Sequence, residues 1–224
     1  MDAHEGEVIA VTFSSPLDLT IHRPEGMYDP ASEHDACGVG MVTPLNKRPE
    51  RKIVDDAIEV LINLNHRGAV GAEENTGDGA GILMSMPDEF MRAVIDAELP
   101  EALHYAAGIA FLDRDIAVSG QQEQAIARIA DEEGLEVLAW REVPTNPDGL
   151  GLQALASMPS FKMLVLADPE RRLAGIDLDR KVYPVRKRTE HEVGTYFASL
   201  SAMTLTYTRM LTTLHRKPSY PDLS

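Results

Sequence analysis

The sequence predicts a fold of alternating helices and strands built around a sizeable core, and two observations support this prediction. Segments with helical hydrophobic spacing and segments with strand-like apolar runs follow one another along the chain with short connections. The chain has 224 residues and 44% of them are hydrophobic, which is ordinary for a globular protein that buries a core. The sequence contains neither an internal repeat nor a low-complexity segment.

The chain is expected to begin with an extended leader over residues 1–36. This stretch contains three prolines and shows neither a helical nor a strand period beyond one short apolar run. Residues 38–43 then form a short apolar run that Pro44 ends, and they predict a strand.

Residues 53–64 predict an amphipathic helix. Asp55 and Asp56 lie in its first turn, where the helix dipole favours acids. The apolar residues that share one helical face are Ile53, Ala57, Val60, Leu61 and Leu64. A glycine-dense stretch follows and predicts a loop that leads into a strand over 82–86.

The later part of the chain continues the alternation of helices and strands. Pro184 is expected to kink the last helix or to mark its start, and Trp140 is expected to pack in or beside the core. We expect helices over 88–97, 121–133 and 177–193, strands over 105–112, 135–141 and 163–166, and a closing hairpin made of 196–200 and 203–211.

Charge argues against nucleic acid as a partner. The net charge is −15, from 21 basic and 36 acidic residues, whereas phosphate binding needs a basic face. The basic cluster Arg186-Lys187-Arg188 is followed by Glu190 and Glu192. We therefore expect this cluster to form a solvated helix face and not a binding patch.

The sequence predicts a cytoplasmic protein. The N-terminal residues carry acids and lack the basic region of a secretory signal. No apolar run approaches the roughly 18 residues that a membrane span needs. The single cysteine excludes an internal disulfide, which suits a reducing compartment.

That cysteine, Cys37, is the candidate nucleophile. A thiolate is a strong nucleophile, and the neighbouring Gly38 and Gly40 would let a substrate or another backbone approach closely. The alternative is that a lone cysteine is a small buried hydrophobic residue. Composition alone leaves both interpretations open.

The seven histidines complete neither a metal motif nor a catalytic motif. His191 begins a sequence like that of a zinc protease helix, but Thr195 stands where the second histidine would be needed. We expect no metal site. His104 or His191 could act as a base for Cys37, although no papain-type signature surrounds the cysteine.

The glycine-rich stretch 76–81 invites comparison with phosphate-binding loops, and the comparison fails on context. A dinucleotide-binding loop follows a strand and opens a helix, whereas here a strand follows the glycines. Nucleotide binding at this stretch is the weakest of the hypotheses that the sequence raises.

A cysteine can also be activated without histidine. If the bond between Ala36 and Cys37 were cut, the α-amine of Cys37, with a pKa of about 7.7–8.0, could serve as its general base. The leader, the nucleophile and the glycines would then belong to one mechanism.

Four motifs give the chain a family resemblance. They occur in the order Tyr28-Asp29-Pro30, Glu33-His34-Asp35-Ala36-Cys37-Gly38-Val39-Gly40, Asn65-His66-Arg67-Gly68-Ala69 and Thr76-Gly77-Asp78-Gly79-Ala80-Gly81-Ile82. Together they closely resemble the N-terminal glutaminase domain of the glutamate synthase large subunit. This domain is a class II glutamine amidotransferase. Weaker similarity extends the resemblance over about 28–210.

The resemblance implies a fold and a site. The fold would be of the α+β class, the four-layer αββα sandwich of antiparallel sheets found in Ntn hydrolases. Residues 1–36 would be a propeptide and residues 37–224 the amidotransferase part. Cys37 would attack the side-chain amide of glutamine, and Arg67 and Gly68 would bind the substrate. Arg67 could alternatively be a structural salt-bridge partner.

The resemblance also implies partners and cofactors outside this sequence. The partners would be the remainder of the large subunit and the small subunit. FMN and an iron–sulfur cluster would belong to later domains, because one cysteine cannot ligate a cluster.

The family's second arginine, its oxyanion hole and a late aspartate would lie beyond Ser224 in the resemblance, so we expect an incomplete fold. Losing one oxyanion donor costs about 10²–10³ in rate, and we therefore expect this chain alone to turn over near background. A non-catalytic interaction or regulatory fragment of the same fold is the alternative.

Overall fold

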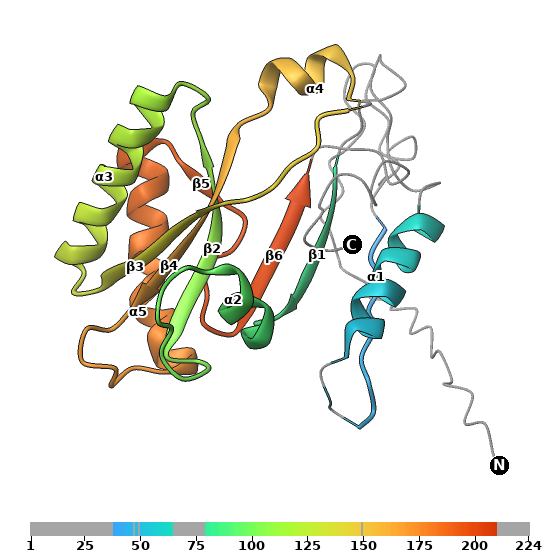
Figure 1. The fold of residues 1–224 in the computed structure, drawn as a ribbon, viewed down its shortest axis with the longest axis horizontal. Coiled ribbons are helices and arrows are strands. Elements are labelled where there is room, and N and C mark those ends of the chain that lie inside the picture. The colour runs from blue at the N-terminus through green and yellow to red at the C-terminus, as the bar shows by residue number, and fades with distance from the viewer. Residues whose placement is uncertain (1–37, 47, 49, 65–78, 149, 210–224) are drawn as a thin grey trace, which may run out of the picture. The chain divides into compact units, whose positions relative to one another are not determined.

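The computed structural model describes residues 38–46, 48, 50–64, 79–148 and 150–209 of the chain (Figure 1). The chain divides into two units, Met1–Asp35 and Ala36–Ser224, and every described residue belongs to the second. Helices and antiparallel sheets make up the described part, which confirms the α+β prediction. The four-layer arrangement of the Ntn-hydrolase type remains a prediction.

A four-stranded antiparallel sheet carries most of the buried residues. Its strands in spatial order are β3 (Glu136–Glu142), β4 (Ser160–Ala167), β2 (Tyr105–Leu112) and β5 (Tyr196–Phe197). The two central strands, β2 and β4, pair along their whole length. Apart from the half-buried Phe111, β2 is fully buried, as expected for a strand that is covered on both faces.

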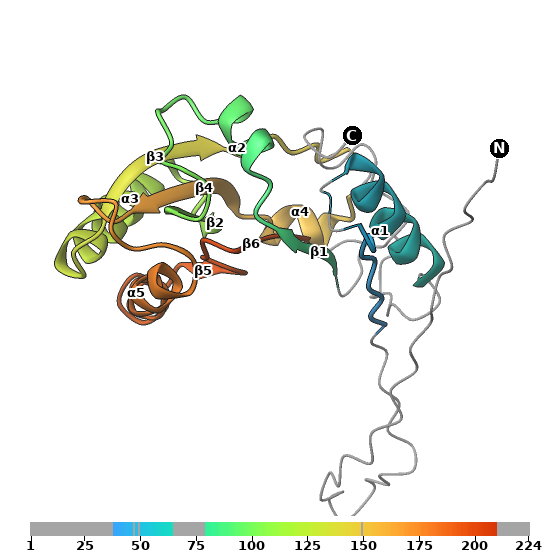
Figure 2. The ribbon, with the colours of Figure 1, turned by 90° about the horizontal axis from the view of Figure 1, so that it is seen from below.

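Two helices, α3 (Ile116–Glu132) and α5 (Gly175–Arg188), cover one face of this sheet, as Figures 1 and 2 show. The Asp115 carboxylate caps α3 by accepting hydrogen bonds from the backbone N–H groups of Ala117 at 2.8 Å and Val118 at 3.2 Å. The core on this side contains Ala106, Ala110, Leu164, Ile126, Ile129, Leu178 and Val182.

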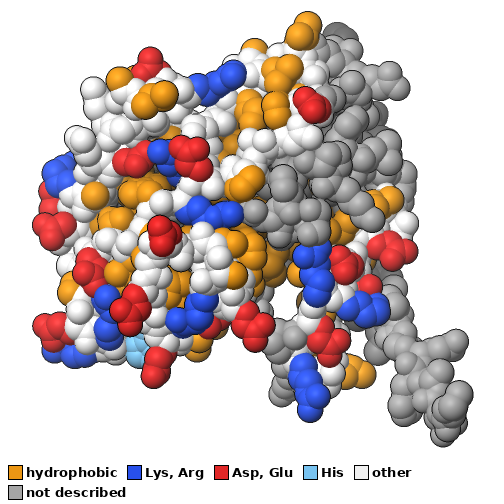
Figure 3. Space-filling view, viewed as in Figure 1, with side chains coloured by type: hydrophobic (Ala, Val, Ile, Leu, Met, Phe, Trp, Pro, Cys, Tyr) orange, Lys and Arg blue, Asp and Glu red, His pale blue; other side chains and the backbone are white. Residues whose placement is uncertain are grey.

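A π-helical turn, η3 (Thr189–Val193), continues α5 and joins it to α3 through Arg188. The Arg188 guanidinium donates to the carboxylates of Glu192 at 2.7 Å, Glu132 at 2.5 Å and Glu133 at 2.9 Å. These hydrogen bonds raise the pKa of Arg188. In the face seen in Figure 3, basic and acidic side chains intermingle over the described part of the chain. The Arg188 side chain is only 29% exposed, and all three residues of the basic cluster are half-buried. Arg188 therefore joins α5 to α3 through ion pairs, which the expected solvated helix face did not include.

The other face of the sheet packs against α2 (Asp88–Val94) and against a two-stranded sheet. This second sheet consists of β1 (Ala80–Ser85) and β6 (Thr204–Arg209), which pair antiparallel. The core on this side contains Met91, Tyr105, Ala107, Ile109, Met163, Val165, Leu205 and Tyr207. Alternate residues of β2 thus serve two cores.

The chain passes from one sheet to the other between β5 and β6. β5 pairs with β2, a single bridge joins Ala107 to Ser201, and β6 pairs with β1. The crossing segment lies tightly on Gly108 of β2, where an added Cβ would be 2.1 Å from the carbonyl oxygen of Ser199. The Asp179 carboxylate of α5 holds the same segment by accepting a 2.8 Å hydrogen bond from the Ser201 hydroxyl.

The structure corrects two expectations and adds one element. The hairpin of 196–200 and 203–211 is wrong, because β5 and β6 pair with different strands. The strand over 38–43 is also wrong, since these residues have no strand partner within the described part. The short helix α4 (Leu152–Ser157) was not predicted, because six residues are too few to show a helical period.

The remaining predicted elements are confirmed within a few residues. The predicted helix over 53–64 is α1 (Arg51–Asn63), and the helix predicted from 121 begins earlier, at Ile116. Pro184 lies inside α5 and does not mark its start. Trp140 packs against the core on the helix side of the sheet, as predicted.

Within the described ranges, no helix combines the length and the apolar character that crossing a membrane requires.

Two glycine substitutions test the packing of the crossing segment. Gly108→Ala should lower the free energy of unfolding by about 1–3 kcal/mol, because its Cβ would overlap the backbone of Ser199. Gly120 in α3 has no atom within 4 Å of an added Cβ, so Gly120→Ala should instead raise it by up to about 1 kcal/mol. Urea denaturation of the two variants measures both effects. Equal stability of the two variants would contradict the tight crossing.

Candidate functional site

The predicted site residues Cys37, Arg67 and Gly68 lie outside the described residues. The structure does describe the chain on either side of them. Gly38 follows Cys37 directly, and Leu64 and Gly79 flank the stretch that contains Arg67 and Gly68. Three described elements therefore flank the predicted site residues in the sequence: α1, β1 and the segment 38–44.

The first of these elements is α1, which leads the chain to residue 65. Two ion pairs support its exposed face, Arg51 with Asp55 at 3.2 Å and Lys52 with Asp56 at 2.6 Å. Such exposed ion pairs contribute little to stability, so the stability of the helix depends on packing of its apolar face. This face is only half-buried, and α1 lies next to β1.

The second element is β1, which receives the chain after residue 78. Gly79 has a φ of 117°, a conformation that side-chain-bearing residues rarely adopt. Gly81 lies close to β6, because an added Cβ would be 2.9 Å from the carbonyl oxygen of Tyr207. These two glycines therefore have structural reasons to be glycine. The predicted strand is present, and it begins at Ala80, so that Gly81 lies within it. Neither reason involves a phosphate.

The third element is the segment that follows Cys37, residues 38–44, which we call the post-cysteine segment. It runs beside α1 in both ribbon views (Figures 1 and 2), and Gly40 lies against the side chain of Val60. The sequence motif around Cys37 did not reveal this contact, because its partner is twenty residues away along the chain. α1 therefore contacts the post-cysteine segment and leads into the stretch that holds Arg67.

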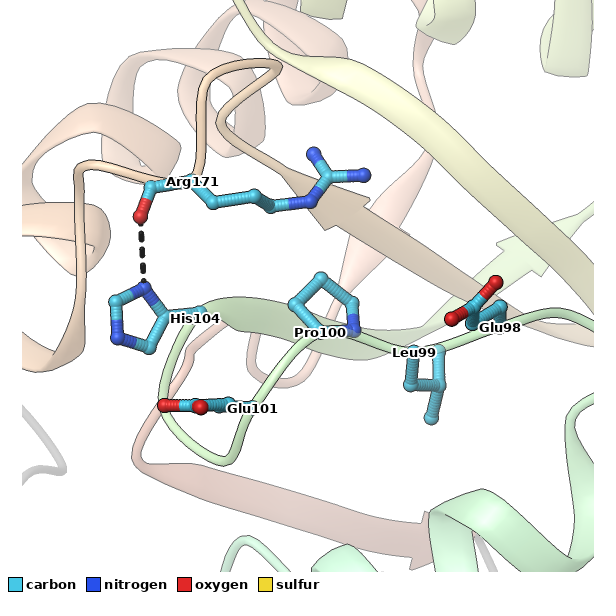
Figure 4. Close-up of a pocket in the computed structure, with 6 residues that line it drawn as sticks. All are labelled: Glu98, Leu99, Pro100, Glu101, His104 and Arg171. Carbon is cyan, nitrogen blue, oxygen red and sulfur yellow. Dashed lines mark hydrogen bonds between the residues drawn. The ribbon is translucent and has the colours of Figure 1, made fainter.

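The described residues also form a pocket of about 590 Å³ at the end of β2 (Figure 4). Its lining residues are Glu98, Leu99, Pro100, Glu101, His104 and Arg171. None of these side chains is a thiol or a hydroxyl, so the pocket contains no nucleophile of that kind. The pocket therefore offers no nucleophile that could replace Cys37.

Two polar side chains of the pocket, His104 and Arg171, have protein partners. His104 Nδ1 lies 3.0 Å from the carbonyl oxygen of Arg171. The Arg171 guanidinium donates to the Glu136 carboxylate and, at 2.6 Å, to the carbonyl oxygen of Asp168. Of the two histidines that the sequence left open as a base, His104 thus lies in this pocket and His191 is exposed on η3.

A partly exposed hydrogen-bond network that the sequence did not reveal supports the wall of this pocket. The Tyr105 hydroxyl donates to Asp88 Oδ1 at 2.8 Å, and Arg92 Nε donates to Asp88 Oδ2 at 2.8 Å. Arg92 Nη1 also donates to the carbonyl oxygen of Leu99 at 3.0 Å. The Arg92 hydrogen bond lowers the pKa of Asp88, whereas burial raises the pKa of Tyr105.

Within the part of the chain that the structure describes, no group of three His, Cys, Asp or Glu residues could hold a metal ion.

Comparison with known proteins gives one family match. The family of glutamine amidotransferases, class II, matches residues 37–224. Among curated proteins, the chain is 34% identical over 207 residues to the glutamate synthase (NADPH) large chain of Bacillus subtilis. It is 36% identical over 210 residues to ferredoxin-dependent glutamate synthase 1 of Arabidopsis thaliana. It is 35% identical over 214 residues to glutamate synthase (NADH) of Schizosaccharomyces pombe.

These relatives are much longer than the chain. The matches cover 90%, 88% and 90% of the chain, and 14%, 13% and 10% of the three relatives in the same order.

The Asp88 network predicts a pH-dependent stability difference. Because the pKa of Asp88 is lowered in the folded protein, its contribution is complete above the unfolded value of about 3.9 and is lost as the pH falls through the folded pKa. At pH 7, Asp88→Asn should cost about 1–2 kcal/mol in the free energy of unfolding. The difference from the wild type should shrink below about pH 4. Urea denaturation across this pH range measures it.

The exposed Asp96 provides the control, since Asp96→Asn changes the same charge outside the network. A constant difference between wild type and Asp88→Asn down to pH values below the folded pKa would contradict the assigned role of Asp88.

Proposed function

The chain belongs to the class II glutamine amidotransferases, and from this membership we propose that it is the glutaminase part of a glutamate synthase, with Cys37 as nucleophile. The observation that carries the proposal is the extent of the family match, which begins at Cys37, the single cysteine of the chain. The glutamate synthase relatives support the assignment within the family.

The proposed reaction has two stages. The Cys37 thiolate attacks the side-chain amide carbon of glutamine, and the amide nitrogen leaves with a proton as ammonia, so that a γ-glutamyl thioester forms. Water then adds to the thioester carbonyl, which releases glutamate and restores the thiol. The base is the α-amine of Cys37, exposed by removal of residues 1–36. Arg67 and Gly68 bind the substrate.

Two features of the described residues support this arrangement. α1 and β1 flank the stretch that contains Arg67 and Gly68. α1 also contacts Gly40 of the post-cysteine segment. Of the histidines considered as alternative bases, His104 lies in the pocket at the end of β2 and His191 on the exposed surface of η3.

The proposal places no cofactor in this chain. A single cysteine does not fit an iron–sulfur cluster, which is commonly held by four cysteine thiolates. The FMN and the cluster expected of a whole glutamate synthase would belong to the remainder of the large subunit. That remainder and the small subunit are the proposed partners, in the cytoplasm.

Covalent labelling tests the nucleophile. A glutamine analogue that carries a diazoketone in place of the amide should modify Cys37 alone, and glutamine should protect against it. Arg67→Lys keeps the charge but loses the planar guanidinium, so it should weaken protection by glutamine about tenfold or more. Peptide mass spectrometry locates the label. Any ammonia release from glutamine, however slow, should be lost in Cys37→Ala.

Two outcomes would contradict this proposal. Labelling of Cys37 that glutamine does not compete would favour the non-catalytic alternative. Ammonia release that persists in Cys37→Ala would exclude Cys37 as the nucleophile.

Intact-mass spectrometry tests the maturation step. Protein that reacts with the glutamine analogue should lack residues 1–36 and begin at Cys37. In a variant whose position 36 resists cleavage, the α-amine cannot act as base and labelling should slow by about 10²–10⁴-fold, the usual contribution of general base catalysis. Full reactivity in protein that retains the leader would refute the amine as the base.

A further inference from the structure

We propose that the contact between Gly40 and Val60 positions the post-cysteine segment on α1, which makes Gly40 a positioning residue for Cys37. The contact itself lies among described residues. Its consequence for catalysis rests on the proposed function.

The contact is unusually close. A Cβ added to Gly40 would lie 2.2 Å from Val60 Cγ1, a separation that real Cβ atoms essentially never show. It would lie 3.6 Å from Val60 Cβ, which is ordinary van der Waals contact. Val60 therefore occupies the space that any side chain at position 40 would need, and only its Cγ1 atom causes the overlap, since Cγ2 would lie at 3.9 Å.

Backbone conformation does not require glycine at this position. Gly40 is absent from the glycines with positive φ, which are Gly79, Gly134, Gly175 and Gly194 among the described residues. An alanine could thus adopt the backbone of residue 40. Glycine is required because the neighbouring helix leaves no space for a side chain, which shows how closely the segment approaches α1.

Val60 cannot easily move aside. A β-branched side chain in a helix strongly prefers one χ1 rotamer, so rotating Cγ1 away is costly. The neighbouring side chains of the segment do not hold it in place either, because Val39 is 88% exposed and Met41 is 83% exposed. A side chain at position 40 would therefore push the segment away from the helix.

Cys37 lies three residues from this contact, and three extended residues span at most about 10 Å. Catalysis needs reacting atoms placed about 3–3.5 Å apart, and a misplacement of 1 Å can cost about 10²-fold in rate. A shift of the segment at Gly40 could thus move the Cys37 nucleophile by more than catalysis tolerates.

The test is a cycle of Gly40→Ala, Val60→Ala and the double variant in the full chain. Gly40→Ala should slow labelling of Cys37 by the glutamine analogue about tenfold or more. Val60→Ala removes the Cγ atoms and leaves the 3.6 Å contact, so the double variant should regain most of the wild-type rate. A residue that matters only for folding would not be rescued in this way.

Gly108→Ala is the matched control for lost stability. It places a Cβ 2.1 Å from a backbone oxygen in the four-stranded sheet, outside the post-cysteine segment. At a temperature well below the melting midpoint of Gly108→Ala, the glutamine analogue should label Cys37 of this variant at the wild-type rate.

A second readout does not depend on glutamine chemistry. Spin labels on Cys37 and on a cysteine introduced by Glu59→Cys, at an exposed position of α1, report the distance between the segment and the helix. Gly40→Ala should shift the distance distribution to longer values, and adding Val60→Ala should reverse the shift.

Each outcome distinguishes the two proposals. An unchanged distance distribution in Gly40→Ala, or no rescue by Val60→Ala, would overturn the positioning role. A distance shift with rescue, in a chain whose Cys37 shows no glutamine-protected labelling, would support the positioning role and refute the proposed glutaminase.

Discussion

The fold depends on burial of both faces of the β2–β4 pair. Side chains on alternate positions of β2 enter opposite cores, Ala106 and Ala110 towards α3 and α5, and Tyr105 and Ile109 towards α2 and the second sheet. A one-residue slip would exchange these sets, so the register is strongly specified. The small residues along β2 leave room for helices on one face and for the crossing segment at Gly108.

This central pair is connected to the elements that flank the predicted site residues in the sequence. The crossing segment on Gly108 carries the chain from the edge of the four-stranded sheet into β6, and β6 is the strand on which β1 forms. β1 in turn receives the chain from the stretch that contains Arg67, and α1 lies next to it. Hydrogen-bonded strands thus connect the core to β1, and α1 lies next to β1 and contacts the post-cysteine segment at Gly40.

The sequence predicted helices and strands well where their apolar residues follow a clear periodic pattern. The helix α1 and the strand β2 were predicted within two residues because their apolar patterns are strong. The fate of 196–211 could not be predicted, since a run rich in Thr, Tyr and Leu indicates strands but not which neighbours they pair with. The strand expected over 38–43 failed for a related reason, because an apolar run becomes a strand only beside a partner.

For the candidate site, the sequence offered motifs, whose assigned roles stay predictions, and it could not offer contacts. The residues around Cys37 and Arg67 suggested a nucleophile and a substrate-binding arginine, and the class II glutamine amidotransferase match covers the same part of the chain. The sequence did not show that Gly40 faces Val60, because steric contacts between distant residues leave no local pattern. The network of Asp88, Arg92 and Tyr105 was hidden for the same reason.

Direct detection of the acyl intermediate tests the central claim, that Cys37 is the nucleophile of a glutaminase. The chain is mixed with glutamine, quenched in acid and mapped by peptide mass spectrometry. A γ-glutamyl adduct is expected on the peptide that begins at Cys37. Hydroxylamine should remove the adduct, because a thioester is labile to hydroxylamine. Glutamine hydrolysis that occurs without this adduct, and equally fast in Cys37→Ala, would show that Cys37 is not the nucleophile.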